Sequence, residues 1–188
     1  MEDVAVFHAE NVAAWRKWLA DNHQSKTGVW LVYHKKSSSK KSITWSESVD
    51  VALCYGWIDG KKIKIDADTS HQYFTKRNPK SGWSKINKDK IAHLLAQGLM
   101  SEAGLASIEI AKQNGSWELY DAIENLEIPV DLTKIFKQYP GTEEYFLSLS
   151  KSNKKFMLHY ISSAKRPETR LKRLHEVADK AGKHQKMQ

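Results

Sequence analysis

The chain has 188 residues, of which 40% are hydrophobic and 10% aromatic, and its formal net charge at pH 7 is +8. This composition excludes an intrinsically disordered chain, and the length fits one domain or one domain with a helical extension. The single cysteine, Cys54, excludes an intramolecular disulfide. The chain shows no signal-peptide pattern and no apolar run long enough to span a membrane, so we expect a cytoplasmic protein.

Basic side chains are concentrated in two segments of the sequence. Residues 26–90 carry 14 basic and 6 acidic side chains, and residues 151–188 carry 11 and 3. Between them, residues 91–150 carry 3 basic and 9 acidic side chains. These segments either neutralise one another in the folded protein or form a basic face for an anionic partner.

The first third of the chain predicts a helix, a strand and a loop. Trp15 and Leu19 recur at helical spacing within residues 10–23. Residues 29–34 (VWLVYH) are apolar on both faces, which is typical of a strand covered on two sides. The basic, serine-rich residues 35–42 predict a mobile surface loop.

A capping box predicts the next helix. Thr44 and Glu47 have the spacing at which each side chain bonds the other's backbone N–H, so we expect a helix over residues 45–55. Gly56 suits the left-handed position that follows a helix. Residues 57–60 then predict an extended exit and a turn.

Two strands and a helical region complete the prediction. Residues 62–66 alternate polar and apolar side chains, and residues 71–76 are their expected antiparallel partner. Helices are then expected over residues 87–98, 101–115, 117–125, 131–140, 142–149 and 152–164, and from residue 167 onward. Asn87 and Asp131 are the expected N-caps of the first and fourth of these helices. The fold class is therefore α+β, a small mostly antiparallel sheet with packed helices followed by an all-helical C-terminal half. We place a division between residues 1–98 and 99–188, with both parts packed as one compact unit.

Three ordered blocks of residues point to a known family. They are residues 45–60, read as W-x-E-x-x-D-x-A-L-C-Y-G-W-I-D-G; Phe74-Thr75-x-Arg77 with Ser81-x-Trp83-Ser84-x-x-Asn87; and residues 164–170, AKRPETR. Together they resemble the bacterial YdeI/OmpD-associated family, also called bacteriocin-protection proteins. The resemblance implies a link to bacteriocin and stress tolerance and to an outer-membrane porin, and it implies no catalytic residues. Because no export signal is seen, we expect any protective role to be exerted inside the cell.

Candidate ligand-binding residues are crowded into the middle of the chain. A guanidinium, two indoles, carboxylates and an amide near a helix start can cradle an anion. The set is Asp50, Trp57, Asp59, Arg77, Trp83, Ser84 and Asn87, and Lys165 and Arg166 would extend the positive surface. The structural alternative is that Trp83 packs under its loop and Ser84 or Asn87 only caps a helix.

Three functions follow as hypotheses, in order of preference. The first is the binding of a small anionic ligand or partner in a pocket lined by tryptophan and Arg77. The second is nucleic-acid binding through the basic loop 35–41 and the C-terminal helices, although no nucleic-acid motif is present. The third is an enzyme with Asp50 or Asp59 as base and Arg77 as an electrostatic clamp. Histidine spacing predicts no metal site, and the sequence implies no cofactor.

Overall fold

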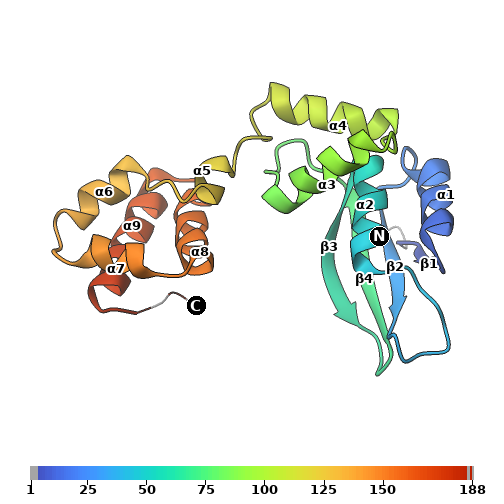
Figure 1. Cartoon of the computed structure of the whole chain (residues 1–188), viewed down its shortest axis with the longest axis horizontal. Helices are drawn as coiled ribbons and strands as arrows, with labels where there is room; N and C mark the ends of the chain where they lie inside the picture. Colours follow the sequence, from blue (N-terminus) through green and yellow to red (C-terminus); the bar gives the residue numbers. More distant parts are fainter. Residues whose placement is uncertain (1–3, 186, 188) are drawn as a thin grey trace. The chain divides into compact units, whose positions relative to one another are not determined.

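The computed structural model describes residues 4–185 and residue 187 (Figure 1). Its contacts divide the chain into two compact units, one ending at Leu119 and the other beginning at Tyr120. The first unit holds a four-stranded sheet with helices, and the second is helical. The predicted α+β fold with a helical C-terminal half is therefore confirmed. No described helix has both the length and the apolar composition that crossing a membrane requires.

The sheet is mostly antiparallel, as predicted. Its strands are β1 (Val6–His8), β2 (Gly28–His34), β3 (Trp57–Lys64) and β4 (Thr69–Lys76), in the order β1-β2-β4-β3. Strand β1 pairs in parallel with β2, whereas the other two pairs are antiparallel. The sequence did not predict β1, and it predicted β3 too short. The pairing of β3 with β4 is irregular between Asp59 and Lys62, which interrupts the alternation that the prediction used.

Two helices cover one face of the sheet. They are α1 (Val12–Asn22) and α2 (Trp45–Cys54), and α2 lies in front of the strands in Figure 1. Trp15 of α1 is fully buried, its ring lies 5.3 Å from that of Phe74, and its Nε1 donates to the Ser48 carbonyl over 3.0 Å. Leu31 of β2 is also fully buried, so the core of this unit lies between the helices and this face.

Local signals placed α2 correctly. The Thr44 hydroxyl accepts from the Glu47 N–H, and the Glu47 carboxylate accepts from the Thr44 N–H, so the capping box is confirmed. Gly56 has a φ of 69°, the left-handed conformation that favours glycine at this position. Cys54 is fully buried, and burial raises the pKa of its thiol, so it behaves as a small apolar core residue.

Replacing Glu47 with glutamine is expected to reduce stability at pH 7 by about 0.3–1 kcal/mol and to leave it nearly unchanged at pH 3. Hydrogen bonds from the hydroxyl and N–H of Thr44 hold the pKa of Glu47 below its usual range. A depressed carboxyl pKa stabilises the folded state above the unfolded pKa of about 4.3, and this is lost as the pH falls through the folded value. Urea unfolding at both pH values tests this, with the exposed Glu118→Gln as control. An equal loss at both pH values would contradict it.

Helices α3 (Lys85–Ala96) and α4 (Glu102–Gln113) complete the first unit. Ser84, not Asn87, is the N-cap of α3, and its hydroxyl accepts from the Asn87 N–H. The sequence-based division at residue 98 separates α3 from α4, yet both belong to this unit. The reason is the close contact of α4 with α2: a Cβ on Gly104 would lie 2.7 Å from the Cys54 carbonyl carbon.

The second unit is built from five described helices around its own core. They are α5 (Asp121–Glu124), α6 (Val130–Phe136), α7 (Thr142–Ser148), α8 (Lys151–Ser162) and α9 (Pro167–Gly182). Helix α5 is shorter than predicted, since it begins at Asp121, and Trp117 belongs to the first unit, where its ring lies 4.9 Å from that of Trp83. Pro129 occupies the N-cap of α6, whereas the predicted cap, Asp131, accepts two hydrogen bonds from Arg170.

Candidate functional site

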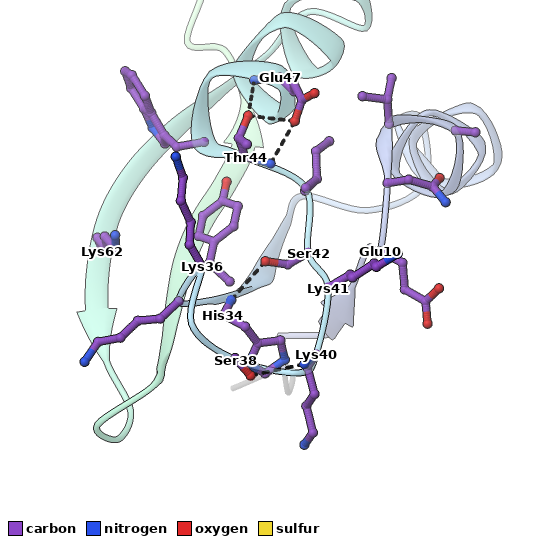
Figure 2. A pocket seen from close by; sticks show the side chains of 17 residues that line it. Glu10, His34, Lys36, Ser38, Lys40, Lys41, Ser42, Thr44, Glu47 and Lys62 are labelled. Atoms are coloured by element: carbon purple, nitrogen blue, oxygen red, sulfur yellow. Dashed lines mark hydrogen bonds between the residues drawn. The ribbon is translucent and has the colours of Figure 1, made fainter.

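A hollow of about 790 Å³ opens beside the N-terminal end of α2 (Figure 2). Its walls are the start of α1, the end of β2 with the loop that follows it, the start of α2, and Lys62 of β3. Five lysines line it: Lys35, Lys36, Lys40, Lys41 and Lys62. We call this hollow the lysine groove. Tyr33 and His34 of β2 and Trp45 of α2 also line it.

The loop of the lysine groove is anchored on two sides. On one side, the Ile43 N–H donates to the Ala9 carbonyl over 3.0 Å, and the His8 ring lies 2.8 Å from the Lys41 carbonyl oxygen. On the other side, the Lys35 N–H donates to the Asp68 carbonyl over 2.9 Å. These bonds hold the two ends of the loop, at Lys35 and at Lys41 to Ile43, and the mobility predicted for the residues between them stays a prediction.

Positive charge dominates the lysine groove. Its two carboxylates are Glu10 and Glu47, and the capping box already occupies Glu47. In Figure 2, Glu10 lies on the opposite side of the loop from Lys36 and Lys62. The positive end of the α2 dipole also faces this hollow, since the capping residue Thr44 lines it. The groove is therefore suited to a negatively charged ligand.

The surroundings shift the pKa values of two ring side chains of β2, Tyr33 and His34. Burial raises the pKa of Tyr33 far above its usual range, and the Tyr33 hydroxyl lies 2.5 Å from the Ser48 hydroxyl. Burial also lowers the pKa of His34, and His8 and Lys40 lower it further. The His34 ring is therefore mostly neutral at pH 7 and gains its charge only in more acidic solution.

A second hollow of about 540 Å³ continues from the lysine groove toward the β3–β4 turn. It shares Tyr33, His34, Lys35 and Lys62 with the groove and adds Lys64. Asp66 and Asp68 also line it. The Asp66 carboxylate accepts from the N–H groups of the turn, which lowers its pKa, and the Asp68 carboxylate lies 3.7 Å from the Lys35 ammonium in an exposed ion pair. The continuous surface gives a ligand more length than the first hollow alone.

Of the residues predicted to bind a ligand, Arg77 and Trp83 lie together. The Arg77 guanidinium carbon is 3.6 Å from the centroid of the Trp83 ring, and its Nη2 donates to the Gly82 carbonyl. Both residues line a hollow of about 280 Å³, whose other walls are largely apolar and include Pro79 and Ile110. Asn114 and Ser116 donate to the Pro79 carbonyl and so hold this loop against the end of α4.

The other predicted site residues have different neighbours. Asp50 forms an ion pair of 2.5 Å with Lys90, and Asp59 accepts from the Trp45 indole over 3.0 Å. Trp57 is 1% exposed and belongs to the core. Ser84 and Asn87 form the cap of α3, and Lys165 and Arg166 are exposed in the second unit, where Arg166 is the N-cap of α9. None of these residues lines the Arg77–Trp83 hollow.

The predicted ligand set omits the lysines of the groove. The run Lys35-Lys36-Ser37-Ser38-Ser39-Lys40-Lys41 is the signal that could have found them, and it supports only the nucleic-acid hypothesis above. Lys62 is recognisable in the sequence only as part of an alternating strand. Its approach to the loop depends on the pairing of β3 with β4 and of β4 with β2, which the local pattern does not give.

Two known protein families match the chain, one within each of its two compact units. Residues 7–107, more than half of the chain, match the model of a family described as a domain of unknown function, DUF8412, and the protein belongs to this family. Residues 125–184 match the model of the family described as Bacteriocin-protection, YdeI or OmpD-Associated (OmdA). The resemblance predicted from the sequence is thus confirmed, with the match lying over the third block, and the first two blocks lie within residues 7–107. Neither the curated proteins nor the solved structures give a match.

Proposed function

We propose that this protein binds a small anionic ligand in the lysine groove. The main support for this proposal is that five lysines line one hollow. The two carboxylates that line it are those of Glu10 and Glu47, and Glu47 is already held in the cap of α2. The volume of about 790 Å³ lies in the range of small-molecule sites. Lysine ammonium groups act as mobile point charges, which suits phosphate or carboxylate groups of varied geometry.

Binding is favoured over catalysis for this protein. Asp50 and Asp59 were the candidate bases, and their carboxylates are engaged by Lys90 and Trp45. The match of residues 125–184 supports a bacteriocin-protection role at the level of the family. We propose that anion binding serves such a tolerance role from the cytoplasm.

The Arg77–Trp83 hollow is a second candidate position for the ligand. A guanidinium stacked on an indole beside apolar walls favours a ligand with one acidic group and a small apolar body. Its volume of about 280 Å³ is smaller than that of the groove, and fewer cations line it. We therefore place it after the lysine groove.

Isothermal titration with inorganic pyrophosphate and with citrate tests the proposal. Changing Lys36, Lys40 and Lys41 together to glutamine is expected to weaken binding by about tenfold or more, which corresponds to about 1.4 kcal/mol. The matched control changes Lys134, Lys137 and Lys151 to glutamine, which are lysines of the second unit, and is expected to change affinity by less than about twofold.

Affinity is also expected to increase as the pH falls toward 5.5. A bound anion favours the protonated His34 ring, and the low pKa of that ring in the free protein leaves it mostly uncharged at pH 7. Equal losses in the two triple variants would contradict the proposal. Loss of binding in Arg77→Gln, with the groove variant unaffected, would move the ligand to the Arg77–Trp83 hollow.

A further inference from the structure

The face of the sheet opposite α1 and α2 carries exposed and half-buried rings. Because side chains alternate along a strand, Trp30 and Val32 point away from the buried Val29 and Leu31. The register places Tyr73 opposite Trp30, and His71 opposite Val32. We call the surface formed by these four residues, with His8 and His34 at its end, the open face. Helices α3 and α4 of this unit contact α2 instead.

Tyr73 lies flat across the open face. A Cβ on Gly28 would lie 2.5 Å from the Tyr73 Cζ and closer still to its hydroxyl oxygen, so the ring covers this glycine. A Cβ on Gly60 would lie 3.6 Å from Cδ1 of the same ring. Glycine on both neighbouring strands therefore leaves room for the tyrosine ring. The Trp30 ring is 5.1 Å away, at an angle of 55°.

The charges near the open face are positive around Trp30, whereas Asp66 and Asp68 lie near His34 at the other end. Among the described strand residues the one carboxylate is Asp59, which bonds Trp45 of α2 and so belongs to the covered face. Lys61 places its ammonium 5.6 Å from the centroid of the Trp30 ring. At the other end of the face, the His8 and His34 rings lie 5.0 Å apart, directly before the loop that carries Lys35 to Lys41.

We infer that the open face binds single-stranded nucleic acid, with bases stacked on Trp30 and Tyr73 and phosphates near Lys61. Unpaired bases stack on aromatic rings of an exposed sheet, and nearby cations hold the backbone. The register also places the aliphatic Val6 and Ile63 on this face, beside Trp30 and His71. Because protein interfaces are rich in aromatic rings too, it is the ammonium of Lys61 beside the Trp30 ring that favours a nucleic acid as the partner. Apart from His34, which lines both surfaces, the inference rests on different residues from those of the lysine groove.

Fluorescence anisotropy with the full chain tests the inference. The probes are labelled oligo-dT and oligo-rU of about 10 nucleotides, a length within the usual site size, and a duplex of equal length. At physiological salt, Trp30→Leu and Tyr73→Leu are each expected to weaken single-strand binding about tenfold. The matched controls, Tyr139→Leu and Phe156→Leu, change exposed aromatic residues of the second unit and are expected to leave it unchanged.

Two further variants separate ring stacking from loss of folding. Lys61→Gln leaves every ring in place and is expected to weaken binding severalfold. Gly28→Ala keeps all rings but displaces Tyr73, and it is expected to weaken binding while far-ultraviolet circular dichroism confirms a folded sheet.

Several results would overturn the inference. These are absence of single-strand binding at physiological salt, tighter binding of the duplex, or unchanged affinity in the folded Trp30 and Tyr73 variants. Sedimentation showing that these two residues instead hold a dimer together would do the same. Pyrophosphate binding in the lysine groove without oligonucleotide binding would overturn this inference alone and leave the proposed function standing.

Discussion

Replacing Gly104 by alanine is expected to destabilise the first unit by about 3 kcal/mol or more. A Cβ at this position would meet the Cys54 carbonyl oxygen and lie 2.7 Å from the carbonyl carbon. These atoms belong to the backbone at the end of α2, so no side-chain rotation relieves the contact. Helix α4 must instead move away from α2, which also disturbs the hydrogen bond from the Ser101 hydroxyl to the Cys54 carbonyl.

This expectation opposes helix propensity, which makes the test informative. Within a helix, alanine is favoured over glycine by about 1 kcal/mol, so propensity alone predicts that the variant is more stable. Gly115→Ala is the matched control, because a Cβ added there would meet no atom within 4 Å and only its φ of 77° opposes the change. Urea unfolding measures both variants. A Gly104→Ala protein as stable as the original would refute the packing argument.

Replacing Trp15 by alanine is expected to cost about 3–5 kcal/mol. The side chain is fully buried, and its ring lies 5.3 Å from each of the Trp18 and Phe74 rings, so its removal leaves a cavity between α1 and the sheet. It also removes the donor to the Ser48 carbonyl. Trp15→Phe retains most of the volume and is expected to cost less, about 1–2 kcal/mol, chiefly through the lost hydrogen bond.

Trp45→Ala is the control for this prediction. Trp45 is 51% exposed, and its indole bonds the carboxylate of Asp59 at the surface, so the expected loss is below about 1 kcal/mol. Chemical unfolding followed by circular dichroism measures the three variants on one scale. Losses of similar size for Trp15→Ala and Trp45→Ala would show that burial does not determine the contribution of these indoles.

Local chemistry made part of the fold predictable. The capping box of Thr44 and Glu47 and the left-handed Gly56 depend on neighbours within a few residues, so the sequence located α2. Strand β1 could not be found in this way. It has three residues, and it exists because Val6 to His8 pair with a strand more than twenty positions further along the chain.

The part of the candidate site that could be predicted is likewise the part formed by residues close together in the sequence. Arg77 and Trp83 are close in sequence and share one loop, so their stacking followed from proximity. Asp50 was expected in the same site, but Lys90, forty residues away, pairs with it. The lysine groove needed still more long-range information, since its loop is fixed by Ala9 and its far wall is Lys62. The lysines of the groove can be read from a single sequence, but the pairing of β2, β4 and β3 that brings them together cannot.

The tryptophans give this protein built-in optical reporters for both proposed surfaces. Trp45 lines the lysine groove, and Trp30 lies on the open face, whereas Trp15, Trp57 and Trp83 are sealed in the interior. An aqueous quencher or an absorbing ligand therefore reaches Trp45 and Trp30 before these three, while the half-buried Trp18 and Trp117 add emission that belongs to neither surface. Comparing emission from Trp45→Phe and Trp30→Phe proteins assigns a spectral change to one surface without attaching any dye.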